Sequence, residues 1–228
     1  EKRYVSAAYV AKKGKASGQY HTFHFDSTLK SECYYRLDKG KGSVLHGPSS
    51  YYGPDGTLLS KVWYIEGLRI GREYRYYLDA KAQSVLQYSQ GKKEGKQVYY
   101  YQNGKMKTQM MYTDGEMDGQ TLLYHENGQL YRSIFYVKSK RQGVEEEYSP
   151  KGVLVAKRIY EEGKIFEELY WSADAVLLEK RIFHHPTAKG DLWKWDEKGN
   201  LRMEGLFSGD DYRHQEWNAE GKLTKKYE

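Results

Sequence analysis

A glycine recurs every 24 residues along the middle of this chain, at Gly47, Gly71, Gly95, Gly119 and Gly143. Three of these glycines have another glycine four residues before them, whereas Ser139 stands in that place before Gly143. A fixed period of this length is the sequence signature of a repeat array, in which each unit contacts only its neighbours. The chain of 228 residues is therefore predicted to contain about eight such units.

Each unit is expected to be a β-hairpin. The chain has 24 tyrosines and 23 glycines but only 4 prolines, which favours short strands joined by glycine turns. Asn103-Gly104 lies between two alternating runs, and an Asn-Gly pair is the strongest short signal for a two-residue type I′ turn. The sequence thus predicts an all-β fold, an elongated single antiparallel meander of about eight β-hairpin repeats.

Alternation along the strands predicts which side chains share a face of the sheet. In the unit that begins at Gly95, the expected packing face is mostly apolar and aromatic and carries Val98, Tyr100, Met106, Thr108, Met110 and Tyr112. In an earlier unit the same alternation puts Cys33 on the packing face, where a thiol behaves as a small hydrophobic group.

The regularity of the repeats divides the chain into three parts. Residues 47–165 hold regular repeats, residues 1–46 hold degenerate repeats with an insertion, and residues 166–228 hold degenerate repeats that are expected to cap the array. The insertion, residues 43–47, predicts a bulged loop or a small break before the regular repeats.

Charge and cysteine content narrow the class of partner and the compartment. The net charge of +6 comes from 37 basic and 31 acidic residues that are scattered along the chain. This balance is weak evidence for binding to nucleic acid or to anionic lipid. Nucleic acid is not expected as a partner, whereas membrane lipid stays a possible one. The single cysteine excludes an intrachain disulfide. The chain opens with Glu1-Lys2-Arg3, as a processed exported protein would and as a cytosolic protein with a trimmed start also would. A periplasmic or envelope-associated location is slightly favoured over a cytoplasmic one.

The sequence points to no catalytic, cofactor or metal site, and an enzyme is not expected. His21 and His24 are three residues apart, and on a strand this spacing puts the two imidazoles on opposite faces. His184-His185 falls in an expected turn, where paired histidines are more often exposed than functional. The sequence contains no nucleophile elbow, phosphate loop or dinucleotide-binding fingerprint.

The segment from Tyr100 to Gly119, YYQNGKMKTQMMYTDGEMDG, resembles a MORN repeat. It is most similar to the bacterial variant of that repeat found in YwqK-like antitoxin and immunity proteins. The resemblance covers residues 47–165 well and residues 18–46 and 166–228 more loosely. It implies a β-hairpin repeat protein of a toxin-antitoxin pair, whose partner is a cognate toxin effector, and it carries over no catalytic residue.

Large apolar residues are also expected on the second face of the sheet, where a solvent-exposed meander would carry polar ones. Such rings contribute contact area at modest entropic cost and dominate protein interfaces, and Lys61, Arg72, Arg75 and Lys107 are expected to form a charged rim. An equally weighted alternative is that sheet twist or a second copy covers them. The candidate partner-binding residues are Tyr51, Trp63, Tyr77, Tyr99, Tyr101, Met111, Tyr131 and Phe135.

The leading hypothesis is a non-enzymatic immunity protein, or antitoxin, that neutralises a toxin effector by occluding it. One alternative is a membrane-associated scaffold that binds anionic lipid through its basic residues. Another is a cell-wall glycan-binding repeat protein that stacks sugars on tyrosine and tryptophan. The five tryptophans do not recur at one place in the repeat, which counts against a reiterated sugar site.

Overall fold

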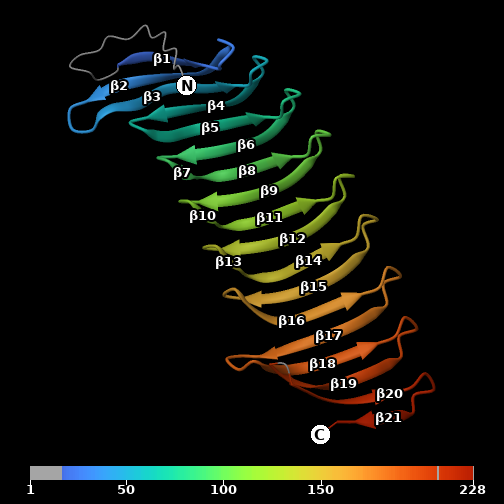
Figure 1. Cartoon of the computed structure of the whole chain (residues 1–228). Coiled ribbons are helices and arrows are strands. Elements are labelled where there is room, and N and C mark those ends of the chain that lie inside the picture. Colours follow the sequence, from blue (N-terminus) through green and yellow to red (C-terminus); the bar gives the residue numbers. More distant parts are fainter. Residues whose placement is uncertain (1–16, 210, 228) are drawn as a thin grey trace. The chain divides into compact units, whose positions relative to one another are not determined.

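The computed structural model describes residues 17–209 and 211–227. These residues form 21 β-strands and no helix, and neighbouring strands pair in antiparallel orientation (Figure 1). The predicted all-β antiparallel meander is therefore confirmed. The chain divides into two compact units, Glu1–Glu116 and Met117–Glu228, and each is described by itself.

The strands of the two units follow the chain order. The first unit holds β1 (Gly18–Phe23), β2 (Leu29–Asp38), β3 (Gly42–Tyr52), β4 (Leu58–Ile65), β5 (Leu68–Tyr76), β6 (Ala82–Ser89), β7 (Lys92–Lys93), β8 (Gly95–Tyr100) and β9 (Met106–Thr113). The short strand β10 (Glu116–Met117) lies at the division. The second unit holds β11 (Gly119–Tyr124), β12 (Leu130–Val137), β13 (Lys140–Arg141), β14 (Gly143–Tyr148), β15 (Leu154–Glu161), β16 (Lys164–Trp171), β17 (Leu177–His184), β18 (Lys189–Trp195), β19 (Leu201–Ser208), β20 (Asp211–Trp217) and β21 (Leu223–Lys226).

The hairpin turn at Asn103-Gly104 is not the predicted type I′ turn. Only Gly104 has a positive φ, 85°, whereas type I′ requires positive φ at both central residues. Tyr101 donates its N–H to the carbonyl of Lys105 at 2.8 Å, which encloses a three-residue loop ending in a left-handed glycine. The Asn103 side chain accepts the N–H of Lys105 at 2.9 Å, so the asparagine supports the loop through its side chain.

The true two-residue turns lie at the other end of the repeats. Asp114 and Gly115 have φ values of 52° and 90°, as type I′ requires. These turns also stack successive repeats, because the N–H of the second turn residue donates to a carbonyl of the preceding repeat at 2.7 to 2.9 Å. The pairs are Gly67 to Leu45, Gly91 to Arg69, Gly115 to Lys93, Ser139 to Met117 and Gly163 to Arg141.

Ser139 shows what the turn demands of a residue other than glycine. Its φ is 63°, in the left-handed region that L-residues seldom adopt. Its hydroxyl accepts a hydrogen bond from the N–H of Met117 at 3.1 Å. The interrupted glycine pattern therefore leaves the turn intact, with one added side-chain contact.

A β-bulge in the hairpins corrects the predicted assignment of faces. Tyr100 lies opposite Met106, but Tyr99 lies opposite Thr108, so Lys107 has no partner on β8. The extra residue shifts the register by one position. Residues on β8 that precede the bulge therefore point to the face opposite the one predicted for them. Val98 is buried, as expected of a packing residue, but it lies on the opposite face from Thr108, so its grouping with that face is wrong.

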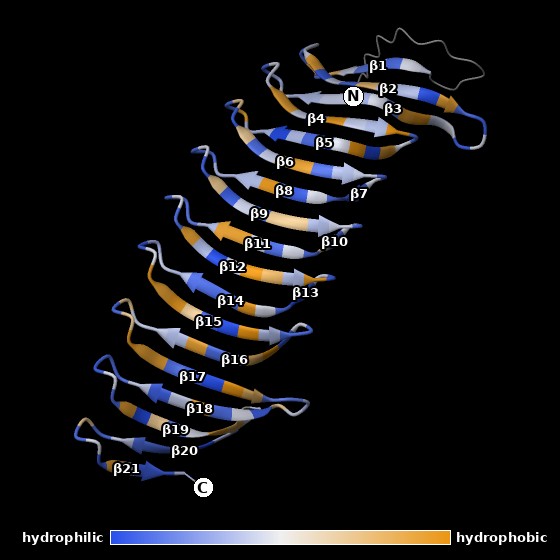
Figure 2. Cartoon of the chain, turned by 180° about the vertical axis from the view of Figure 1, so that it is seen from behind, coloured by the Kyte–Doolittle hydropathy of each residue, from blue (hydrophilic) through white to orange (hydrophobic). Residues whose placement is uncertain are grey.

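One face of the sheet in each unit carries most of the buried side chains, and we call it the buried face; the opposite face is the open face. The buried face of the first unit holds Cys33, Val62, Glu73, Ser84, Leu86, Tyr88 and Gln97. That of the second unit holds Thr121, Ile134, Glu145, Ala156, Tyr160 and Leu192. Hydrophobic and hydrophilic residues alternate along many strands (Figure 2), yet the buried sets include acidic and amide side chains, so this face is not the apolar surface that was predicted.

The inserted residues 43–47 lie within β3, and the predicted loop or break there is wrong. Leu37 is opposite Ser43 and Tyr35 is opposite Leu45, with an irregular register between Cys33 and Tyr35. The insertion therefore lengthens the hairpin of β2 and β3. The division of the chain into regular and degenerate repeats at residues 46 and 165 stays a prediction.

Candidate binding surfaces

The eight candidate partner-binding residues do not share one face of the sheet. Tyr51 lies opposite Ser60, and Tyr99 lies opposite Thr108, on the buried face in both cases. Trp63, Met111 and Phe135 lie on the open face of their units. The prediction of a single aromatic surface is wrong because the bulge shifts the first strand of the hairpin against the second.

Tyr77 and Tyr101 open three-residue loops and belong to the turns. The Tyr77 hydroxyl donates to the carbonyl of Tyr100 in the next hairpin at 2.7 Å, and the ammonium of Lys107 lies 5.5 Å from the ring of Tyr101. His125 takes the equivalent place in the second unit and hydrogen-bonds the carbonyl of Tyr148 at 2.8 Å. Aromatic residues at this place therefore connect the turns of successive repeats.

Tyr131 also packs within a turn region. Its ring lies 4.9 Å from that of His125, and its hydroxyl accepts a hydrogen bond from Arg132 at 3.0 Å. These contacts occupy both the ring and the polar tip of Tyr131. Trp63 and Phe135 are then the large aromatic candidates that lie exposed on an open face.

An apolar patch lies on the open face of the first unit. Trp63 is 48% exposed and lies opposite Ile70, while Ile65 lies opposite Leu68, which is also 48% exposed. We call these four residues the first apolar patch. Exposed apolar side chains that cluster in this way are typical of interaction sites.

The open face of the second unit carries a comparable set. Phe135 is 45% exposed and Val144 is 43% exposed, and Val137 is exposed beside them on β12. Val144 lies opposite Ile159. Phe135 and Trp63 occupy the same place in the 24-residue repeat, three periods apart, so the repeat delivers a large ring to the open face of both units.

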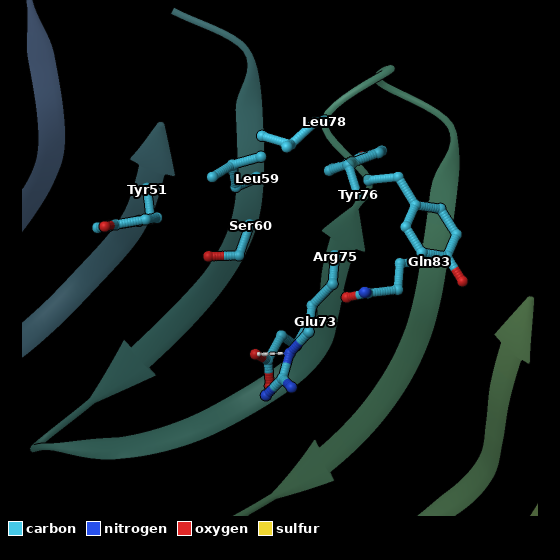
Figure 3. Close-up of a pocket in the computed structure, with 9 residues that line it drawn as sticks. Tyr51, Leu59, Ser60, Glu73, Arg75, Tyr76, Leu78 and Gln83 are labelled. Atoms are coloured by element: carbon cyan, nitrogen blue, oxygen red, sulfur yellow. Dashed lines mark hydrogen bonds and ion pairs between the residues drawn. The ribbon is translucent and has the colours of Figure 1, made fainter. Parts of the chain in front are cut away.

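A shallow groove of about 480 Å³ lies on the buried face of the first unit (Figure 3). Glu73 is only 5% exposed and accepts a hydrogen bond from Nε of Arg75 at 2.7 Å. Ser60 lies opposite Arg75 on the neighbouring strand, and both residues line the groove. Residues lining the groove are Tyr51, Leu59, Ser60, Glu73, Arg75, Tyr76, Tyr77, Leu78 and Gln83.

The buried face of the second unit holds an ionic cluster around Glu145, whose carboxylate is 1% exposed. It lies 3.1 Å from Arg158, 3.2 Å from Arg141 and 3.7 Å from Arg132. Burial lowers the pKa of Arg158, but hydrogen bonds to Glu147 and to a tyrosine outweigh burial and raise that pKa above its ordinary value. The cluster pairs one buried carboxylate with three partly exposed guanidinium groups, which makes it a structural element of the sheet.

Basic side chains stack on tyrosines at one recurring place in the repeat. Each basic residue lies two positions before a periodic glycine, and its tyrosine lies seventeen positions after that glycine. Such cation–π contacts contribute about 0.5 to 1 kcal/mol each where they are exposed. The pairs and their distances are Arg69 over Tyr88 at 5.2 Å, Lys93 over Tyr112 at 4.9 Å and Arg141 over Tyr160 at 5.2 Å.

The other candidate functional groups have structural partners. His21 contacts the side chain of Gln19 at 3.0 Å, and His24 hydrogen-bonds the carbonyl of Tyr52 at 3.0 Å. Cys33 is buried as predicted, and burial raises the pKa of its thiol. Within residues 17–209 and 211–227, three or more side chains suited to bind a metal do not come together. The same residues include no helix with the length and hydrophobicity to cross a membrane.

Comparison with known proteins identifies repeats in the middle of the chain. Residues 93–114 and 117–138 match the family model of the MORN repeat variant. No curated protein sequence is significantly similar to the chain.

Solved structures with partial similarity come from much larger toxin assemblies. The chain is 12% identical to a chain of the TcdB2-TccC3-Cdc42 complex, with a TM-score of 0.24, over 91% of this chain and 12% of the other. For the Tc holotoxin pore of Photorhabdus luminescens the identity is 12% and the TM-score 0.23, over 88% of this chain and 15% of the other. The chain thus spans less than a sixth of these proteins. Residues 93–138 contain two adjacent repeats of the MORN variant, a kind of repeat that forms binding modules.

Proposed function

We propose that this chain is a non-enzymatic protein-binding module that neutralises a toxic effector by occluding it. The observation that carries the proposal is the exposure of Trp63 and Phe135 at one repeat position on the open faces of the two units. Tryptophan and other large rings dominate the binding energy of protein interfaces.

The apolar side chains on the open faces would contribute part of the binding energy of a complex. Fully burying a leucine, isoleucine or phenylalanine side chain contributes about 1.5 to 3 kcal/mol, and those in question are already roughly half covered. Four or five of them, covered together, would contribute on the order of 5 kcal/mol before the cost of association is subtracted. The remaining binding energy would come from polar contacts that the partner adds at the rim.

The identity of the partner rests on the resemblance of the repeats to the YwqK-like antitoxin family. A toxin bound across strands of the sheet would have its active site covered by a broad surface, with no chemistry required of this chain. An envelope-directed toxin would go with an exported immunity protein, and a toxin that acts on nucleic acid would go with a cytoplasmic one.

A capture experiment with the product of the neighbouring gene tests the proposal, because immunity proteins are normally encoded beside their toxins. The tagged chain should retain that protein in a stoichiometric complex. The variant Trp63→Ala/Phe135→Ala should lose it, whereas Tyr99→Ala, on the buried face, should keep it. Circular dichroism confirms that each variant is folded. Failure of the folded wild type to retain the protein would contradict the immunity function.

A further inference from the structure

Three basic residues share the open face of the first unit with the first apolar patch. Lys61, Arg72 and Lys96 are all exposed. Lys61 lies opposite Tyr74, on the strand that also carries Ile70 of the patch. These cations therefore share a surface with Trp63, Ile65, Leu68 and Ile70.

Each of the three cations faces a neutral residue across the strands. Arg72 lies opposite Gln87, and Lys96 lies opposite Met111. Within the described part of the chain, Lys61, Arg72 and Lys96 form no ion pair. Their charges are thus uncompensated in the isolated protein.

Carboxylates near this surface are already engaged. Glu32 lies opposite Ser50, which in turn lies opposite Lys61. Its carboxylate already accepts a hydrogen bond from Tyr52 at 2.9 Å. Glu66, at the turn between β4 and β5, pairs with Arg36 at 2.7 Å. Neither is directed to the three cations by a hydrogen bond or ion pair.

Several other cations of the sheet are paired with carboxylates. On the buried face of the first unit, Arg69 and Arg75 both contact the carboxylate of Glu73. On the open face of the second unit, Lys180 pairs with Glu167 at 3.0 Å. The unpaired positive charge of Lys61, Arg72 and Lys96 therefore contrasts with these paired cations.

We infer that this surface binds an acidic segment of the partner protein in which carboxylates alternate with apolar residues. The inference rests on the proposed function and specifies the chemistry of its binding site. Apolar side chains of the segment would cover Trp63 and Leu68, and its carboxylates would pair with Arg72, Lys96 and Lys61. Charge complementarity of this kind sets the specificity and the rate of association more than the affinity.

A protein segment fits better than an anionic lipid surface. Gln87 lies opposite Arg72 and adds a neutral amide, which can both donate to and accept from a peptide group. Arginine pairs with peptide carboxylates through two parallel hydrogen bonds, and the attraction of an anionic lipid surface contributes about 1 kcal/mol per basic residue. Lipid remains an outcome of the test.

Selection from a phage-displayed library of random peptides, about a dozen residues long, tests the inference without requiring the partner protein itself. The purified chain is the target, and enriched peptides are made synthetically for affinity measurements. The test variant is Lys61→Glu/Arg72→Glu/Lys96→Glu. The control, Lys138→Glu/Lys151→Glu/Lys164→Glu, changes the net charge equally through exposed lysines of the second unit.

Enriched peptides should combine Asp or Glu with aliphatic or aromatic residues. Their affinity should fall at least about tenfold in the test variant, the factor equivalent to about 1.4 kcal/mol, and by much less in the control. It should also weaken as salt rises from 50 to 500 mM. Neutral peptides, equal binding to the test variant, or no enrichment would overturn the inference.

Two further results separate the possible failures. Binding to phosphatidylserine vesicles but not to phosphatidylcholine vesicles, abolished in the test variant and without peptide enrichment, would assign the surface to lipid and overturn the inference. Retention of the neighbouring gene product by a folded test variant would also overturn it. That second result would leave the proposed protein-binding function intact.

Discussion

The carboxylate of Glu145 lies 3.1 Å from the guanidinium of Arg158 on the buried face of the second unit, with two further arginines within 3.7 Å. Removing one partner of a buried pair leaves an uncompensated charge, which costs about 3 to 5 kcal/mol. Since the arginines are partly exposed, Glu145→Ala should lower the free energy of unfolding by about 3 kcal/mol. Urea unfolding measures the change.

The neighbouring residue provides the control for this prediction. Glu146 points to the open face and accepts one hydrogen bond, from Tyr148 at 2.8 Å. Glu146→Ala should therefore cost about 1 kcal/mol or less. Equal losses in the two variants would mean that the ionic cluster adds no stability of its own.

The left-handed turns are a second test of how the repeats are built. Gly163 has a φ of 83°, and its N–H donates to the carbonyl of Arg141 at 2.9 Å. Gly163→Ala forces a Cβ into this conformation and should cost about 1 to 2 kcal/mol in unfolding free energy. Ser139→Gly relieves the same strain but loses the bond to Met117, so its net effect should stay within about 1 kcal/mol. A neutral Gly163→Ala would contradict the turn assignment.

Gly190 tests how closely neighbouring strands pack. Its φ angle lies outside the left-handed region, so only steric contact opposes a larger residue there. A Cβ at this position would lie 2.0 Å from the carbonyl oxygen of Ile182 and 2.4 Å from the ring of Phe207. Because backbone must move to admit it, Gly190→Ala should lower the melting temperature by an amount equivalent to about 3 kcal/mol. A Cβ added at Gly221 would meet no atom within 4 Å outside its chain neighbours. Gly221→Ala should therefore cost only the strain of its φ of 75°, about 1 kcal/mol.

Asp196 should make the second unit sensitive to acid. Its pKa is lowered, chiefly because it accepts the backbone N–H of Asn200, with a further contribution from Arg202. A carboxyl with a lowered folded pKa contributes stability above its unfolded value, near 3.9, and loses it as the pH falls toward the folded value. Asp196→Asn should therefore show a smaller drop in melting temperature than the wild type between pH 6 and pH 2.5. Parallel drops would contradict this role.

The architecture could be predicted from sequence because the glycine period and the strand alternation are local signals. Gly115 needs a left-handed conformation, and the repeat of that need every 24 residues marks the turns. The predicted turn type at Asn103-Gly104 was wrong, because this pair is compatible with both a two-residue and a three-residue loop. Cross-strand hydrogen bonds decide between the two, and these depend on the partner strand.

The candidate site was predictable only in part. Trp63 and Phe135 were expected on the second face and lie there, since they follow the bulge in the chain and keep the predicted alternation. Tyr51 and Tyr99 precede it and lie on the buried face. The bulge leaves no composition signal in a strand of alternating residues. Lys61 and Arg72 were expected from the sequence as part of a charged rim. That they form no ion pair among the described residues could not be predicted, because pairing depends on which residues face them across the strands.

The most direct test of the account is hydroxyl-radical footprinting of the chain, free and in complex with the neighbouring gene product. Unlike amide exchange, this labelling distinguishes the two faces of one sheet. Trp63, Leu68 and Phe135 should lose reactivity in the complex, while Tyr51 on the buried face should keep it. Protection of Tyr51 with unchanged labelling of Trp63 and Phe135 would contradict the account and place the partner on the buried face.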